Sequence, residues 1–231
     1  MLEQILYYER EAFFLLNGSH SPFWDRFMWL YSGKTVWLPI AVLIIIILIY
    51  KKNWRDSMLV LLALVLVVTL CDQFASHFCK PFFSRFRPTH HPDFMNQVKT
   101  VFGYRGGYYG FISSHAANAF GFALFMSLLF RNCIFTVTIF FWAACSAYSR
   151  IYLGVHFISD IAFGCVAGML LGCGVYVFYI RIRKQLYRRV GEKIQPSAIY
   201  SPKQKQAIVL AIFVTFLILL IFNVPLTTFI G

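Results

Sequence analysis

The chain has 231 residues, of which 59% are hydrophobic, 19% are aromatic and only 13% are charged. A soluble domain of this length cannot bury so large a share of apolar side chains, so the composition excludes a soluble protein and indicates an integral membrane protein. The formal net charge is +12. In so apolar a chain, this excess favours anionic lipid headgroups over nucleic acid as the partner.

The length suits one compact bundle, and we expect residues 1–231 to form a single membrane domain. The six cysteines are scattered through apolar runs without a CxxC pair, which argues against a metal site or a disulfide framework. The first residues lack the basic start and short apolar core of a cleavable signal peptide. We therefore expect the internal spans to direct insertion.

The N-terminal stretch predicts a short amphipathic helix. Apolar residues recur at roughly helical spacing from residue 2 to residue 16, with polar residues between them, and Asn17-Gly18 ends the pattern. We expect residues 1–22 to hold a helix that lies at the membrane interface rather than crossing the bilayer. Ser21-Pro22 then begins another helix, with serine as the cap and proline in the first turn.

Six further apolar runs have the character of transmembrane helices. Most contain the roughly 20 apolar residues that a bilayer requires, and the third and fourth are shorter. They lie at residues 28–50, 57–78, 113–130, 133–148, 156–180 and 207–224. The connections are brief except at residues 79–112 and 181–206. The sequence therefore predicts an all-α integral membrane bundle of six transmembrane helices with an N-terminal interfacial helix.

The basic residues predict the orientation of this bundle. If residues 51–55, Arg131 and the 181–206 loop share one side, that side holds 12 of the 21 Lys and Arg residues. The positive-inside rule then places the 181–206 loop in the cytoplasm, and the 79–112 loop and both termini outside. The basic loop is either a topology signal alone or also a site for acidic lipid. We expect the inner (cytoplasmic) membrane as the location, with the 79–112 loop on its external, periplasmic face.

The fifth apolar run carries a stripe of small residues. Gly164, Gly168 and Gly172 repeat every four residues, which lets another helix approach closely. Packing within the chain's own bundle is the default interpretation of such a stripe. A homodimer formed through it is the alternative.

The end of the second run places two cations beside prolines. Lys80 and Arg87 are separated by six residues, and Pro81 and Pro88 are expected to interrupt the helix, so both cations should lie in an irregular turn at the bilayer surface. Two cations held in this way can bind one polyanion. Basic residues at the end of a span also serve as anchors that reach the headgroups, and this cluster alone does not decide between the two.

The start of the third run combines two serines with a histidine. Ser113, Ser114 and His115 stand at a predicted helix N-terminus, where unpaired backbone N–H groups and a partial positive charge suit phosphate. A serine hydroxyl can add a hydrogen bond, and the histidine can deliver a proton. The alternative is a serine cap followed by an interfacial histidine.

The connection from the fourth run to the fifth carries an arginine, a histidine and an aspartate. The chain reads as a long helix from His156 onward, which makes His156 and Asp160 an i,i+4 pair on one face. A carboxylate one turn from an imidazole fixes its tautomer and leaves the other ring nitrogen free to act. Arg150 supplies a planar fork suited to phosphate.

Topology brings the three clusters to one face of the membrane, because the second run ends, the third begins and the fourth-to-fifth connection turns on the same side. The residues expected to converge are Lys80, Arg87, Ser113, His115, Arg150, His156 and Asp160. Such a set describes a phosphate pocket that contains a nucleophile and an acid. The sequence offers no carboxylate cluster suited to magnesium or zinc, so we expect phosphoryl transfer without a metal or another cofactor.

The pattern Lys80-x6-Arg87-Pro88, Ser113-Ser114-His115 and Ser149-Arg150-x5-His156-x3-Asp160 resembles the three-part signature of the type 2 phosphatidic acid phosphatase superfamily. That superfamily includes lipid phosphate phosphatases, polyprenyl pyrophosphate phosphatases, glucose-6-phosphatase and vanadium haloperoxidases. The first and third parts match in full. In the second part, Ile112 and Ser114 stand where the family usually has the proline and glycine of Pro-Ser-Gly-His.

The resemblance implies a role for each residue. His156 is expected to attack phosphorus and form a phosphohistidine, while Asp160 accepts a hydrogen bond from its other ring nitrogen. His115 is expected to protonate the leaving lipid oxygen and then to activate water. The residues expected to bind the substrate phosphate are Lys80, Arg87, Ser113, Ser114 and Arg150.

An external site suits an envelope lipid with a long acyl or prenyl tail, such as undecaprenyl pyrophosphate, lipid A or phosphatidylglycerol phosphate. The loop from Pro88 to Phe111 is expected to cap the pocket and select the headgroup. Asp93 in this loop has either a functional role or that of a solvated residue.

Other classes of protein remain to be weighed. A soluble vanadium haloperoxidase shares the motifs, but the continuous apolar spans argue against it. A non-catalytic lipid-binding or flipping protein would typically have lost the nucleophile or the acid, and both His156 and His115 are present. A small-solute transporter would need polar groups at mid-membrane, and Asp72 and Gln73 are the main ones here.

Overall fold

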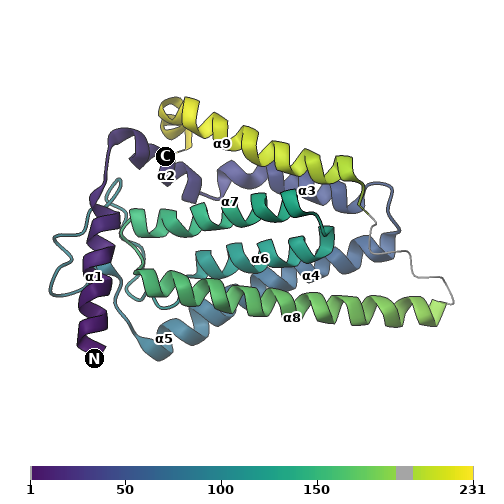
Figure 1. Cartoon of the computed structure of the whole chain (residues 1–231), viewed down its shortest axis with the longest axis horizontal. Helices are drawn as coiled ribbons and strands as arrows, with labels where there is room; N and C mark the ends of the chain where they lie inside the picture. Colours follow the sequence, from purple (N-terminus) through teal and green to yellow (C-terminus); the bar gives the residue numbers. More distant parts are fainter. Residues whose placement is uncertain (1, 191–199, 231) are drawn as a thin grey trace.

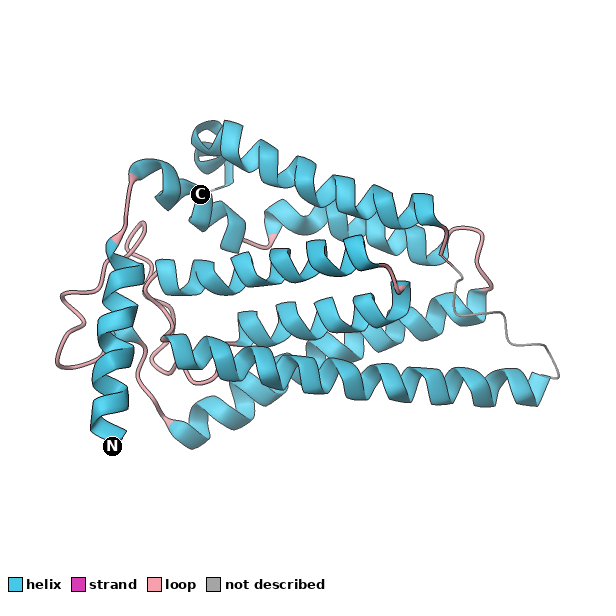
Figure 2. Ribbon diagram, in the orientation of Figure 1, coloured by secondary structure: helices cyan, strands magenta, loops and turns pink. Residues whose placement is uncertain are grey.

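The computed structural model describes residues 2–190 and 200–230, and the regular elements in those ranges are helices (Figure 2). Long helices lie side by side, and α1 (Leu2–Gly18) runs across one end of them (Figure 1). The remaining elements are α2 (Pro22–Ser32), η1 (Thr35–Trp37), α3 (Leu38–Ile49), α4 (Trp54–Gln73), η2 (Phe74–Cys79), α5 (Lys80–Phe83), η3 (Pro88–His90), α6 (Ser114–Phe130), α7 (Cys133–Tyr152), α8 (Ile158–Val190) and α9 (Pro202–Ile230).

The all-α, multi-pass character predicted from composition is confirmed. Within the described ranges, four helices are long and apolar enough to cross a membrane, and a fifth span results if the bent pair formed by α2 and η1–α3 counts as one. The third predicted run is α6, which is apolar but has only 17 residues. Six transmembrane helices and an interfacial position for α1 therefore stay predictions.

The first predicted span is bent rather than continuous. α2 begins as predicted, because Ser21 caps it by accepting a hydrogen bond from the Trp24 N–H at 3.3 Å. The helix then stops at Ser32, and η1–α3 leaves it at an angle of 64°. Gly33 and Lys34 stand at this break. Apolar content alone does not reveal the bend, because the chain is apolar on both sides of it.

The prediction that Pro81 interrupts the second span was wrong. α4 runs into a π-helical segment, η2, and helical structure continues through α5 to Phe83. Pro81 stands in the first turn of α5, where a missing N–H and a fixed φ are tolerated. Lys80 is therefore held on a helix. The chain leaves the helix at Ser84, whose φ is 46°, so only Arg87 lies in irregular structure as predicted.

The boundaries of the predicted 181–206 loop were also wrong. α8 has 33 residues and extends to Val190, a length of about 50 Å against a hydrocarbon core of about 30 Å. Its basic end is anchored, because buried Asp56 of α4 accepts hydrogen bonds from Arg183 at 2.7 Å and from the Tyr187 hydroxyl at 2.8 Å. The basic residues at this end of α8 must lie outside the lipid, but they can remain helical there. Residues 191–199 lie outside the described part of the chain.

The glycine stripe packs inside the bundle, as its default interpretation predicts. A Cβ added at Gly168 would lie 2.1 Å from the backbone oxygen of Ala117, and one added at Gly172 would lie 2.4 Å from that of Gly121. A Cβ added at Gly164 would likewise lie 2.8 Å from the backbone oxygen of Ser113. The stripe therefore lets the backbone of α8 contact the backbone of α6. A homodimer through the same surface would have to displace α6.

Replacing Gly168 with alanine is expected to destabilise the protein by about 1–3 kcal/mol, because the new methyl group forces the two helix backbones apart. Gly174 on the same helix is the matched control, since an added Cβ there meets nothing within 4 Å. Gly174→Ala should be neutral or stabilising by about 0.5–1 kcal/mol. Thermal unfolding in detergent measures both variants. Equal stability of the two would contradict the close α6–α8 contact.

Candidate active site

The turn between α7 and α8 places the histidine of the third motif. α7 ends at Tyr152, and Gly154 follows with a φ of 76°. A side chain at Gly154 would be strained by that φ and would lie 2.7 Å from the Lys99 backbone oxygen. The chain then runs through His156 before α8 begins at Ile158. The prediction that α8 starts at His156 was therefore wrong by two residues.

His156 and Asp160 nevertheless face each other as predicted. The Nδ1 atom of His156 lies 3.4 Å from Oδ2 of Asp160, at the long end for a hydrogen bond. The same Oδ2 accepts a shorter bond from the Phe157 N–H at 3.0 Å, and the imidazole also has a hydrogen bond with the backbone of Gly110. The side chains of His156 and Asp160 are 2% and 0% exposed.

The electrostatic setting of His156 keeps its imidazole neutral. Burial, and then the positive charges of Arg87 and Arg150, lower the pKa of His156 well below its usual value. Lys80 contributes to the same effect. A neutral imidazole has a free lone pair, so His156 is suited to act as a nucleophile at neutral pH.

Arg150 is a buried cation with no carboxylate partner among the described residues. Its guanidinium donates one hydrogen bond to the Ser32 hydroxyl and another to the Tyr104 hydroxyl at 3.1 Å. Its Nε atom has no hydrogen-bond partner in the described part of the chain, and the residue is only 4% exposed. A buried charge is costly unless it is paired, so this guanidinium is suited to an anion that supplies the missing partner.

Arg87 is likewise a buried cation with no carboxylate partner in the described part of the chain. It is 8% exposed, and its guanidinium donates to the backbone oxygens of Tyr109 at 3.1 Å and Val155 at 3.3 Å. Burial and the nearby charge of Arg150 lower the pKa of Arg87. Carbonyl dipoles solvate the guanidinium without neutralising it, so a positive charge remains at the site.

Lys80 reaches the second motif. Its ammonium donates to the Ser114 hydroxyl at 2.7 Å and to the Ser76 hydroxyl at 3.2 Å. Ser113 is different, because its side chain is fully buried and caps α6 by accepting from the Ala116 N–H at 3.4 Å. Of the two predicted serines, Ser114 is therefore the one beside a cation.

Within residues 2–190 and 200–230, none of these three cations has a carboxylate oxygen within 4.0 Å. The same part of the chain contains no group of three or more His, Cys, Asp or Glu side chains that could hold a metal ion. Charged and imidazole side chains of the three predicted motifs thus lie within electrostatic reach of one another, and Lys80, Arg87 and Arg150 make this region positive.

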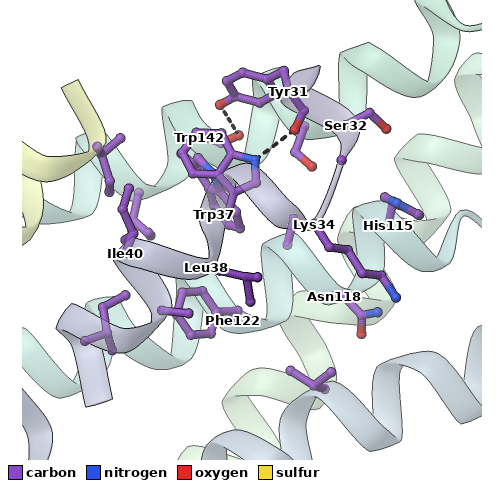
Figure 3. A pocket seen from close by; sticks show the side chains of 18 of the residues that line it. Tyr31, Ser32, Lys34, Trp37, Leu38, Ile40, His115, Asn118, Phe122 and Trp142 are labelled. Carbon is purple, nitrogen blue, oxygen red and sulfur yellow. Dashed lines mark hydrogen bonds between the residues drawn. The ribbon is translucent and has the colours of Figure 1, made fainter. Parts of the chain in front are cut away.

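His115 stands at the boundary between this region and an apolar cavity. It lies within electrostatic reach of Arg150 and His156. It also lines a cavity of about 450 Å³ whose walls come from α2, α3, α4, α6, α7 and α9. Figure 3 shows His115, Lys34 and Asn118 at one end of this cavity, and Leu38, Ile40 and Phe122 toward the other. The cavity is thus suited to an apolar body with a polar end beside His115.

A second pocket, of about 270 Å³, is also lined by His115. It shares Ser32 and Lys34 with the apolar cavity and is also lined by Tyr104 and Arg150. Tyr104 belongs to the loop predicted to cap the site, and its hydroxyl accepts the bond from Arg150 described above. Asp93 in the same loop is 76% exposed and faces His91 at 3.7 Å, which favours a solvated residue.

Sequence reasoning missed several residues that support the site. They are Glu9, Ser32, Ser76, Arg85 and Gly110. Arg85 could have been identified from the sequence, because it lies inside the first motif between Lys80 and Arg87. The others lie in stretches that contain no recognisable motif, and only the fold brings them to the site.

The chain is similar to known proteins over most of its length. A family model described as the PAP2 superfamily matches residues 58–184, a range that contains all three motifs. A lipid A 4'-phosphatase of Porphyromonas gingivalis is 46% identical over 200 residues, covering 87% of this chain and 84% of that protein. A lipid A 4'-phosphatase of Bacteroides thetaiotaomicron is 32% identical over 225 residues, covering 97% and 99%.

Two solved structures are similar in fold. Aquifex aeolicus LpxE has a TM-score of 0.54 and 26% identity, covering 71% of this chain and 92% of that one. A transmembrane PAP2 type phosphatidylglycerolphosphate phosphatase from Bacillus subtilis has a TM-score of 0.58 and 20% identity, covering 78% and 88%. The second likeness concerns the fold alone.

Proposed function

The chain belongs to the PAP2 superfamily, and from this membership, its relatives and its site we propose that it is a membrane phosphatase that acts on lipid A, with the 4'-phosphate as the first candidate. The observation that carries the proposal is the pair of buried guanidinium groups, Arg87 and Arg150, which lie near a neutral His156 and have no carboxylate partner among the residues that the structure describes. A phosphate dianion supplies the missing negative charge.

The reaction begins with the attack of His156 on phosphorus. Asp160 accepts a hydrogen bond from the Nδ1–H of the imidazole, which leaves Nε2 as the attacking atom. The bond from phosphorus to the lipid oxygen breaks as the new bond to Nε2 forms, giving a phosphohistidine. His115 donates a proton to the departing oxygen and later accepts one from the water that releases phosphate.

The cations stabilise the charge that spreads over the three equatorial oxygens of the transferred group. Arg87 and Arg150 contribute through their guanidinium N–H groups, and Lys80 contributes together with the hydroxyl of Ser114. Ser113 acts through the start of α6, which its side chain caps. The site needs no metal for these steps, since the protein's own cations supply the positive charge.

The cavity of about 450 Å³ holds the part of the lipid next to the scissile bond, with the remainder in the bilayer. We place the protein in the inner membrane with the site on the periplasmic face, on the basis of the distribution of its basic residues. Homodimer formation through the glycine stripe of α8 has no support from the packing of that stripe.

A substrate panel in mixed micelles with EDTA tests this proposal. We expect the purified protein to release phosphate from lipid A faster than from undecaprenyl pyrophosphate or phosphatidylglycerol phosphate, and vanadate to inhibit the release. Phosphorus NMR of the product identifies which phosphate has been lost. Binding of lipid A without phosphate release from any of the three lipids would instead favour a non-catalytic lipid-binding or flipping protein.

A further inference from the structure

Arg85 joins the N-terminal helix to the aspartate of the third motif. One guanidinium nitrogen, NH1, donates to Oδ1 of Asp160 at 2.9 Å and to the Ser159 hydroxyl at 2.6 Å. The other, NH2, donates to Oε2 of Glu9 in α1 at 2.7 Å. The side chains of Arg85, Glu9 and Asp160 are 25%, 12% and 0% exposed. Each terminal nitrogen of the Arg85 guanidinium thus donates a hydrogen bond to a carboxylate.

Glu9 makes a second contact with the start of α8. Its Oε1 accepts a hydrogen bond from the Ser159 N–H at 2.8 Å, while its Oε2 binds Arg85. The Arg85 guanidinium also lies over the ring of Phe157, 4.4 Å from its centroid. Phe157 follows His156 in the chain and packs against Phe13 of α1. The first helix therefore contacts two residues, Phe157 and Ser159, that lie between His156 and Asp160 in the chain.

These contacts decide how the Asp160 carboxylate is held. Its Oδ1 is fixed by Arg85 and its Oδ2 by the Phe157 N–H, and both bonds are shorter than the 3.4 Å contact with His156. A carboxylate without exposed surface is costly to keep ionised unless a cation is bonded to it. Arg85 is the cation in direct contact with Asp160 in the described chain.

We propose that Arg85 is a positioning residue for the phosphatase reaction, and that Glu9 of α1 holds Arg85 in place. The bridge keeps Asp160 charged and oriented, and Asp160 in turn fixes the tautomer in which His156 attacks phosphorus. The inference rests on the proposed function. It assigns Arg85 a role unlike that of Arg87 and Arg150, because a guanidinium already bonded to two carboxylates has little charge left for phosphate.

A kinetic comparison of Arg85→Gln with the unmodified protein tests this inference. We expect kcat for lipid phosphate to fall on the order of 10- to 100-fold, the scale seen for the outer partners of metal-bound histidines. KM should be unchanged, because no contact with substrate is lost. Arg85→Lys should recover part of kcat, since a lysine supplies charge without the bidentate fork. Arg10→Gln is the matched control, because Arg10 lines a pocket of about 560 Å³ together with Glu9 and Arg85 but does not contact Asp160 in the described chain.

The path of the effect is tested by combining substitutions. In an Asp160→Asn background, Arg85→Gln should have little further effect, because the residue through which it acts is already changed. Glu9→Gln should lower kcat less than Arg85→Gln does, and Glu11→Gln, which alters an exposed carboxylate on the same helix, should have no effect. Glu9→Gln also serves as the second variant if Arg85→Gln does not fold.

The inference would be overturned if Arg85→Gln raised KM and left kcat normal. It would also be overturned if Arg85→Gln lowered kcat by the same factor in the unmodified protein and in the Asp160→Asn background. Its failure is distinguishable from that of the proposed function by His156→Ala in the same assay. If His156→Ala is inactive and Arg85→Gln and Glu9→Gln retain normal kcat, only the role of Arg85 is wrong. If His156→Ala retains turnover, the proposed mechanism itself is wrong.

Discussion

Replacing His156 with alanine is expected to lower kcat by about 10⁴-fold or more, the scale on which enzymes lose activity when the nucleophile of a catalytic unit is removed. The imidazole is 2% exposed and flanked by Asp160 and the Gly110 backbone, so no other side chain can replace it at the same position. Removal of a neutral, buried ring leaves the cations in place. Lipid phosphate should therefore still bind.

Phosphate release from lipid A measures this loss, and lipid binding and thermal unfolding show whether the variant is folded. A phosphorus-32 lipid should label the unmodified protein but not His156→Ala. The label should be lost in acid, because a phosphohistidine hydrolyses in acid. His77→Ala is the matched control, since His77 is exposed and lies outside the site. Retention of turnover by His156→Ala would assign the nucleophile to another residue.

Replacing His115 with alanine is expected to lower kcat for lipid A by about 10²- to 10⁴-fold, the contribution typical of general acid catalysis. The size of the loss should depend on the leaving group. A sugar oxygen is a poor leaving group and needs a proton, whereas p-nitrophenolate leaves without one. The loss should therefore be much smaller for p-nitrophenyl phosphate.

Measuring both substrates with the same preparation separates the role of an acid from a loss of folded protein. A folding defect lowers both activities by the same factor, while loss of the acid affects mainly the lipid. Equal losses with a normal unfolding temperature would instead show that His115 binds phosphate rather than protonating the leaving oxygen.

Most of the fold could be predicted from the sequence, because the lengths of apolar runs reflect the thickness of the bilayer. The predictions failed where a helix does something that composition does not record. The Ser32–Thr35 break bends a run that is apolar on both sides. The basic end of α8 stays helical because Asp56 of α4 accepts hydrogen bonds from both Arg183 and the Tyr187 hydroxyl. Asp56 is separated from Arg183 by 127 residues in the sequence, so no local pattern links the two.

The candidate site was predictable to the extent that its residues fall into motifs with distinctive spacing. Lys80, His115 and His156 were named from such motifs, and the structure brings them into one region. Arg85 was not named, because a lone arginine at the end of a span has the same appearance as a membrane anchor. Its partner Glu9 is separated from it by 76 residues, and no local pattern links the two.

The direct backbone contact between α6 and α8 has a consequence for how a bulky lipid reaches the histidines. His115 stands on the first turn of α6, and Asp160 on the first turn of α8, next to Gly164. Helices packed this tightly resist sliding past one another, so we expect His115 and Asp160 to keep a fixed separation. The bent α2–α3 segment lines the same cavity without such a contact to α6, and we expect a bulky headgroup to displace this segment first.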